Sequence, residues 1–265
     1  MAAAPNLPDS DSSSGNPACT TTETISYVPP AVSCTTVADG FYTNGGRLYD
    51  ACGSEFVMRG VNNPHIWFDP GNQYLAYQAL DTIAGYGTNT IRVVWETSGD
   101  ATLLAQVLYR IVELDMVPSV ELHDATGSSS DSDLQQMAQY YTQADVAQVM
   151  QDFRQYVLIN IANEWSGSNF SSAYQTAIST IRSAGLTHTL VIDANSWGQN
   201  AQAIFDGHAA LTAADPESNL LFDVHMYGEY SSTTTVDSVL DQMRSSNIPI
   251  VVGQFGCQAT LCPPS

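Results

Sequence analysis

The chain contains no lysine, and arginine supplies all seven of its basic side chains. Because these face 27 acidic residues, the formal net charge is -20 at pH 7. Phosphate backbones and anionic lipid surfaces are bound by clustered Lys and Arg, which this composition does not offer. We therefore expect neither a nucleic-acid partner nor a membrane partner.

Long apolar runs and cofactor motifs are also lacking. The sequence shows no run near the ~20 apolar residues that a membrane-spanning helix requires. It has no Gly-rich phosphate loop, no GxSxG elbow and no Cys or His spacing typical of zinc. We expect no cofactor and no metal site.

Cysteine is scarce and odd in number. The five residues, of which four lie in terminal segments, are Cys19, Cys34, Cys52, Cys257 and Cys262. At least one is unpaired within a monomer, and the spacing leaves the connectivity open. The chain begins Met-Ala-Ala-Ala-Pro, without the basic start and apolar stretch of a signal peptide. We expect a secreted monomer whose signal peptide is absent from this chain.

The composition changes near residue 40. Residues 1–39 are rich in Ser, Thr, Pro and Asp without clear periodicity, which is typical of a tail or linker. Residues 40–265 form the expected folded domain. It opens with "FYTNGGRLYDACGSEF", in which Asn44, Gly45 and Gly46 favour a hairpin turn.

Short apolar runs then alternate with amphipathic stretches. The runs cover residues 56–61, 90–95, 117–123, 157–163, 189–194, 220–227 and 248–255. The amphipathic stretches predict helices within residues 72–87, 101–115, 133–155, 171–185 and 233–247. Near-continuous apolar strands separated by crossover helices indicate a parallel sheet covered on both faces.

Polar residues gather at the carboxyl end of nearly every run. They are Asn62-Asn63, Trp95-Glu96, His123-Asp124, Asn163-Glu164, His225, Tyr227 and Gln254. Barrels of the (β/α)₈ type place their chemistry at that rim, with residues drawn from many strands. The α/β class with a TIM-barrel architecture is therefore expected.

Two of these residues and one residue inside a run point to chemistry. Glu164 would place a carboxylate at the rim, although a strand-end Glu also caps helices or pairs with Arg. His225 lies two residues before Tyr227 on one strand, although a buried, satisfied histidine is common. Arg92 lies among apolar neighbours and needs a carboxylate partner. The natural partner would end the seventh run, where the residue is Gln254.

In its ordered motifs the chain resembles the retaining glycoside hydrolases of family 5, and their mannanase branch most closely. The segments that carry the resemblance are "LYDACGSEFVMRGVNNPHIWF", "GTNTIRVVW", "VELHDATG", "INIANEWSG", "GLTHTLVIDANSWGQ", "FDVHMYG" and "VVGQFG". The resemblance implies a catalytic (β/α)₈ barrel over residues 40–265. Because only "CQATLCPPS" follows Gly256, we expect the eighth strand and its helix to be lacking.

The resemblance also implies residue roles. Glu164 matches the acid/base, and Gln254 holds the place of the nucleophile, which is a glutamate in the family. A retaining mechanism needs two carboxyl groups ~5–5.5 Å apart. By resemblance Arg92 and Tyr227 would support the nucleophile, and Asn163 would hold the sugar 2-hydroxyl. The remaining sugar contacts would come from His123, His225, Trp67 and Trp197, with Trp95 and Trp165 as further stacking candidates.

The amide of Gln254 has the shape of glutamate but cannot form a glycosyl ester. Hydrolysis by this chain is therefore expected to be almost abolished. We interpret Gln254 as an inactivating substitution in an endo-acting enzyme that cleaves β-1,4-mannosidic bonds of mannan, glucomannan or galactomannan. The alternatives are an endo-β-1,4-glucanase and a natural, non-catalytic carbohydrate-binding relative. A polysaccharide is the expected partner in each case.

Overall fold

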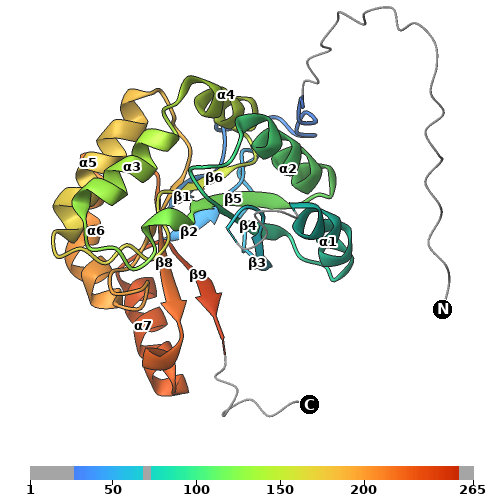
Figure 1. The fold of residues 1–265 in the computed structure, drawn as a ribbon. Coiled ribbons are helices and arrows are strands. Elements are labelled where there is room, and N and C mark those ends of the chain that lie inside the picture. The colour runs from blue at the N-terminus through green and yellow to red at the C-terminus, as the bar shows by residue number, and fades with distance from the viewer. Residues whose placement is uncertain (1–26, 68–72, 257–265) are drawn as a thin grey trace, which may run out of the picture.

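The computed structural model describes residues 27–67 and 73–256, and within them one parallel sheet forms an incomplete barrel (Figure 1). The seven strands are hydrogen-bonded in sequence order from β3 to β9. They are β3 (Gly60–Pro64), β4 (Thr90–Trp95), β5 (Val117–Leu122), β6 (Leu158–Asn160), β7 (Leu190–Asp193), β8 (Leu220–Met226) and β9 (Ile250–Phe255). The expected barrel without an eighth strand is confirmed for the described residues.

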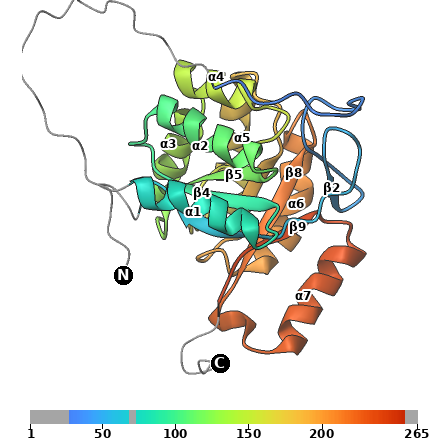
Figure 2. The same ribbon diagram turned by 90° about the vertical axis from the view of Figure 1, so that its right-hand side faces the viewer.

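Helices connect successive strands and cover the outside of the sheet. They are α1 (Gln73–Gly85), α2 (Ala101–Glu113), α3 (Asp131–Tyr140), α4 (Ala144–Asp152), α5 (Phe170–Ser183), α6 (Ala201–Ala214) and α7 (Thr233–Ser245). Single 3₁₀ turns lie at η1 (His123–Ala125) and η2 (Gly228–Tyr230). Figure 2 shows α7 below the labels of β8 and β9, near the last two strands of the sheet.

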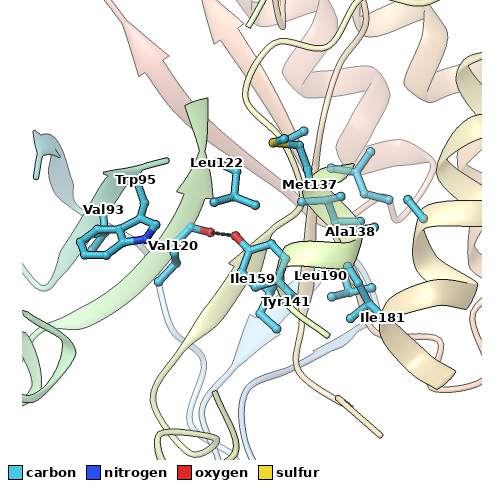
Figure 3. Packing of buried hydrophobic residues seen from close by; sticks show 14 of the residues in the cluster. Val93, Trp95, Val120, Leu122, Met137, Ala138, Tyr141, Ile159, Ile181 and Leu190 are labelled. Atoms are coloured by element: carbon cyan, nitrogen blue, oxygen red, sulfur yellow. Dashed lines mark hydrogen bonds between the residues drawn. The ribbon is translucent and has the colours of Figure 1, made fainter. Parts of the chain in front are cut away.

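The main hydrophobic core lies between these helices and the sheet (Figure 3). Tyr141 is fully buried there, and its hydroxyl lies 3.1 Å from the carbonyl oxygen of Val120 on β5 and 3.0 Å from that of Asn160 on β6. The hydroxyl can donate its proton to either strand. Burying this ring therefore also satisfies a polar group at the junction of β5 and β6.

A hairpin closes the amino-terminal end of the barrel. Strands β1 (Tyr42–Asn44) and β2 (Arg47–Tyr49) are joined through Gly45 and Gly46, which both have the positive φ that this turn requires. A second apolar cluster joins the hairpin to the first residues of the barrel strands. Its buried members are Phe41, Leu48, Val117, Leu158, Val191 and Leu221. The carboxyl-terminal end of the barrel is thereby left as the open mouth.

Strands β3 and β9 are the two edges of the described sheet. Every residue of β4 to β8 is buried, whereas three of the five residues of β3 are exposed and β9 has no buried residue. A cavity of about 580 Å³ lies between the two edges and reaches Arg92 and Asp223 inside the barrel. The side-chain amide of Asn62 donates to Gly253 O at 3.2 Å across this gap.

Two sequence-based boundaries need correction. The first strand begins at Gly60 rather than at residue 56, because Phe56 and Met58 pack against the hairpin cluster below it. The single helix expected over residues 133–155 is two helices, α3 and α4, which turn at residues 141–143 where the Tyr141 ring enters the core. Helix α6 is not among the helices that periodicity indicated.

The described part of the segment before residue 40 lies against the barrel. Pro30 O accepts a hydrogen bond from the Tyr156 hydroxyl at 2.6 Å, the Tyr27 ring packs on Tyr109, and a disulfide joins Cys34 to Cys52. None of the helices in the described part of the chain has the length and apolar character needed to cross a membrane.

Candidate active site

Glu164 lies at the barrel mouth just beyond β6, in an unusual backbone conformation. Its φ of 50° is left-handed, which is uncommon for a residue with a side chain and is found more often at functional sites. The turn is held at both ends, because Glu164 N donates to Asp193 Oδ2 at 3.0 Å and Glu164 O accepts from Gly127 N at 3.1 Å. The Glu164 side chain is mostly buried. This turn ends the strand and directs the carboxylate to the mouth.

His225, on β8, is the direct partner of that carboxylate. Its Nδ1 lies 2.8 Å from Glu164 Oε1, and the ring is fully buried. Gly198 packs closely over the ring, since a Cβ there would fall 2.3 Å from Nδ1. In this structure His225 lies buried beneath Gly198 and contacts the Glu164 carboxylate, so its expected sugar contact stays a prediction.

Gln254, on β9, reaches the same mouth from the opposite side. Its Nε2 donates to Asn163 Oδ1 at 2.9 Å, and its Oε1 accepts from the Tyr227 hydroxyl at 3.0 Å. The predicted contact between Tyr227 and residue 254 is confirmed. Asn163 directly precedes Glu164, and Gln254 pairs in register with His225. Asn163 thus contacts Gln254 on β9, and the next residue, Glu164, contacts His225 on β8. These two contacts bring side chains from β6, β8 and β9 together at the mouth.

Arg92 lies inside the barrel, below the mouth. Its guanidinium donates to Asn160, Asn163 and Asp193 at 2.8–3.2 Å. It also lies 3.4 Å from Glu121 and 4.0 Å from Asp223. A carboxylate partner was expected, and three are present. The proposed pairing with residue 254 is not among these contacts, because the arginine is held by β5, β6, β7 and β8 instead.

The interior side chains form a polar layer with one member from each of five successive strands. The members are Arg92, Glu121, Asn160, Asp193 and Asp223, all buried. Sequence reasoning missed the last four. The detectable signal was a carboxylate or amide side chain within each apolar run, as in "VPSVEL", "LIN", "LVID" and "LLFDVHM". Burying such a polar side chain costs free energy unless hydrogen-bond or ion-pair partners lie beside it inside the barrel.

Burial and charge set the ionisation of this layer. Burial by itself lowers the pKa of His225, but the Asp193 and Asp223 carboxylates and the bond to Glu164 outweigh it and raise the pKa to about 10. Burial likewise opposes the charge of Arg92, yet the surrounding carboxylates raise its pKa. Burial raises the pKa of Asp193, against the opposing effect of His225 and Arg92. Two cations therefore lie within a group of carboxylates at neutral pH.

The pKa of Tyr227 is also raised, first by burial and then by the negative charge of Glu164. The phenol consequently keeps its proton and remains a donor to residue 254.

The aromatic residues divide into two groups. Trp67 and Trp197 are 45% and 52% exposed at the mouth, and the Trp67 ring packs at 4.1 Å between centroids on His123, whose Nδ1 contacts Glu121. Trp95 and Trp165 are fully buried, and their indole N–H groups bond to Tyr140 and to Ser130 O. The last two are core residues and not stacking platforms.

Asp193, Asp223 and His225 bring possible metal-ligand atoms within 4.8 Å of one another. The oxygens involved already face cations. Asp193 Oδ2 lies 3.2 Å from Arg92 and 3.4 Å from His225, and Asp223 Oδ2 lies 3.6 Å from His225. A further cation would meet two positive charges there, so ion pairing accounts for this cluster.

Comparison with known proteins adds the family. The model of the family "Cellulase (glycosyl hydrolase family 5)" matches residues 49–262. A mannan endo-1,4-beta-mannosidase of Salipaludibacillus agaradhaerens is 40% identical over 232 residues, which cover 83% of this chain and 73% of the relative. One of Cellvibrio japonicus (strain Ueda107) is 35% identical over 82% of this chain, which spans about half (52%) of that relative.

Solved structures agree with the sequence matches. The beta-mannanase from Thermomonospora fusca superimposes with a TM-score of 0.75 at 34% identity, over 83% of this chain and 75% of that chain. The catalytic domain of a mannanase from Streptomyces sp. SirexAA-E gives a TM-score of 0.75 at 30% identity, over 88% of this chain and 76% of that chain. The similarity therefore covers most of the chain.

Proposed function

The chain belongs to glycosyl hydrolase family 5, and we propose that its barrel mouth is the substrate site of a retaining endo-β-1,4-mannosidase whose nucleophile position holds Gln254. The observation that carries the proposal is the convergence at that mouth. Gln254 bonds to Asn163 and Tyr227, while the adjacent Glu164 bonds to His225. An acid and a glutamate-shaped group thus approach one site from β6 and β9.

The reaction assigned to a chain with glutamate at position 254 follows from these places. The carboxylate attacks the anomeric carbon, the glycosidic C–O bond breaks, and Glu164 gives its proton to the departing oxygen. Glu164 then takes a proton from the water that hydrolyses the glycosyl ester, which restores both carboxyl groups. Tyr227 directs its hydroxyl at residue 254, and Asn163 lies beside it to contact the sugar.

Gln254 stops this sequence at its first step. The amide oxygen carries no full negative charge and cannot yield a stable glycosyl ester, whereas its hydrogen bonds keep the side chain in place. We infer that this chain binds β-mannan without appreciable cleavage. Loss of a nucleophile lowers the rate by on the order of 10⁴ or more. The exposed Trp67 and Trp197 would supply stacking surfaces for the polymer.

Mannan is the favoured polymer because the relatives named above are mannanases, and T. fusca beta-mannanase has been solved as mannotriose and mannohexaose complexes. A glucan is the second candidate. It is favoured by the description of the matching family and by a 31% identical relative from Caldicellulosiruptor saccharolyticus described as beta-mannanase/endoglucanase A. A non-catalytic binding protein would share the same contacts.

The decisive experiment restores the acid. Gln254→Glu should hydrolyse mannan with retention of anomeric configuration at least ~10⁴-fold faster than the chain with Gln254. Parallel assays on cellulose separate the two polymers. Binding of mannohexaose without any gain of hydrolysis in Gln254→Glu would favour a pure binding protein. No binding and no hydrolysis would reject the site.

The Cys34–Cys52 disulfide bears on the compartment. Such bonds persist in oxidising surroundings, so we infer that the chain acts outside the cytosol, as a secreted enzyme would. Mass spectrometry after thiol labelling, with and without reductant, should show this pair to be oxidised.

A further inference from the structure

Asp223, in the middle of β8, uses its two carboxylate oxygens on different neighbours. Oδ1 accepts a hydrogen bond from Gly253 N on β9 at 2.6 Å. Oδ2 faces the cations, 3.6 Å from His225 Nε2 and 4.0 Å from Arg92 Nε. The side chain is 1% exposed. A single buried carboxylate therefore contacts the strand of Gln254 and the ring that supports Glu164.

The strand contact falls on a β-bulge. Asp223 pairs with Val251, but His225, two residues on, pairs with Gln254, three residues on. Side chains alternate along a strand, so in a regular pairing residue 253 would share the inner face with Val251, and residue 254 would point outward. The extra residue in β9 turns Gln254 inward to Asn163 and Tyr227.

Gly253 and Asp223 fit together at this bulge. A bulge leaves a backbone N–H without its strand partner, and here Asp223 accepts it. A Cβ on residue 253 would lie 1.9 Å from Asp223 Oδ2, so only glycine leaves the carboxylate in place. The Gly-Gln order in "IVVGQF" is thus explained by the neighbouring strand.

We propose that Asp223 is a positioning residue that couples the two halves of the reaction centre. Through Oδ1 it holds the bulge that turns residue 254 into the mouth, and through Oδ2 it holds His225 and thereby its bond to Glu164. The inference rests on the proposed function, which assigns Glu164 and position 254 to the reaction.

The groups that face His225 set the background for a test. They are the carboxylates of Glu164 after β6, Asp193 on β7 and Asp223 on β8 itself. Arg92 on β4 pairs with the same two aspartates, and the neutral Gln254 on β9 is the register partner of His225. Asp193 still faces the ring when Asp223 is changed. Removing the Asp223 charge should therefore weaken, and not abolish, the hold on the imidazolium proton.

Two substitutions separate the two contacts. Asp223→Asn keeps an oxygen acceptor for Gly253 N but removes the charge, whereas Asp223→Ala removes both. Asp215→Asn is the matched control, because Asp215 is also buried and pairs with an arginine, Arg182, away from the mouth. The readouts are the NMR titration of the His225 ring and hydrogen exchange at the Gly253 amide, both in the ligand-free chain.

We expect Asp223→Asn to lower the proton affinity of His225 about tenfold while Gly253 exchange stays within about threefold of the unaltered chain. Asp223→Ala should lower the proton affinity similarly and speed Gly253 exchange about tenfold or more. Asp215→Asn should do neither. An unchanged His225 titration in Asp223→Asn, or Gly253 exchange no faster in Asp223→Ala than in Asp215→Asn, would overturn the proposal.

Gly253→Ala tests the bulge if Asp223→Ala does not fold. Its methyl group displaces the carboxylate, so mannohexaose affinity should fall about tenfold, and Asp223→Asn should lose much less. Unaltered affinity in a folded Gly253→Ala chain contradicts the positioning role. Failure of the unaltered chain to bind mannohexaose instead counts against the proposed function, while the titration and exchange results still decide the role of Asp223.

Discussion

Strands β4 to β8 and the edge strands β3 and β9 belong to one sheet but differ in how they are held. Each strand from β4 to β8 has two neighbours and is buried throughout, whereas β3 and β9 each have one neighbour and remain partly open, with Val61 43% and Phe255 77% exposed. We call the buried strands β4 to β8 the closed arc. The proposed acid, Glu164, follows β6 in this arc. Its counterpart, Gln254, sits on an open edge.

This difference indicates that the two sides of the proposed reaction centre are stabilised by different means. Glu164 is placed by a strand buried on both faces and by Asp193. Residue 254 depends on β8 alone for strand pairing, and on side chains from β8 and the β6 end for its direction. The edge strand therefore gains its precision from hydrogen bonds more than from packing.

The largest expected effect comes from the open edge. Gln254→Glu should raise mannan hydrolysis at least ~10⁴-fold, because it supplies the attacking carboxylate of the proposed mechanism. Adding Glu164→Gln from the closed arc should remove most of that gain, since the leaving oxygen then receives no proton. Initial rates on mannan measure both. Full activity in the double variant would show that Glu164 is not the acid.

The next effect compares buried and exposed polar contacts. Arg92→Met should lower the free energy of unfolding by about 3–5 kcal/mol, because Glu121, Asp193 and Asp223 lose the cation they surround. Asn62→Ala removes the exposed bond from β3 to Gly253 and should cost less than about 1 kcal/mol. Urea unfolding of both variants gives the comparison. Equal losses of unfolding free energy in the two variants would mean that the contact between β3 and β9 contributes as much to stability as the buried contacts of Arg92.

A third effect follows from two buried histidines, His188 before β7 and His65 after β3. Burial lowers the pKa of each to about 4, whereas the unfolded chain titrates near ~6.5. The unfolded state therefore binds protons first, so each residue should cost about 3 kcal/mol of stability as the pH falls from about 6.5 to 4.

Unfolding measured across that pH range checks this effect. His188→Gln in the arc and His65→Gln beside the edge should each reduce the fall in the free energy of unfolding between about pH 6.5 and 4, which we call the acid limb. A limb that flattens only for His188→Gln would indicate that the edge opens and protonates His65 before the whole barrel unfolds. Unchanged limbs in both variants would contradict the assigned cause.

The smallest effect comes from a matched pair of valines. Val120 is fully buried on β5 and Val61 is 43% exposed on β3. Val120→Ala should lower the free energy of unfolding by about 2 kcal/mol, because it removes two buried methyl groups and leaves a void. Val61→Ala should cost less than about 0.5 kcal/mol. Thermal unfolding of both variants measures these losses of stability. A large loss for Val61→Ala would show that strand β3 is covered in solution.

Much of the fold was predictable because its signals are local. Apolar runs mark the strands from β4 to β9, and polar residues at their ends mark the mouth, including Glu164 and Gln254. The errors lie where distant contacts override local pattern. Phe56 and Met58 look like strand residues but pack under the barrel, and Tyr141 breaks an amphipathic stretch to enter the core.

The candidate site was predicted less completely than the fold. The contact of Tyr227 with Gln254 was implied by the family resemblance, and the need of Arg92 for a carboxylate followed from its apolar neighbours. The identity of the arginine's partners did not, because Glu121, Asp193 and Asp223 come from three strands that are far apart in the sequence. The contact of His225 with Glu164 was not predicted either, because it depends on the Gly198 turn that covers the ring.

The sequence by itself determined the alternation of strands and helices, the rim at which polar residues collect, and the amide at position 254, since these depend on residue type and spacing along the chain. Only the tertiary structure decided which way Gln254 points, because the bulge in β9 is defined by its register against β8. It also decided which charges surround Arg92 and His225, because strand closure brings into contact residues that no local pattern connects.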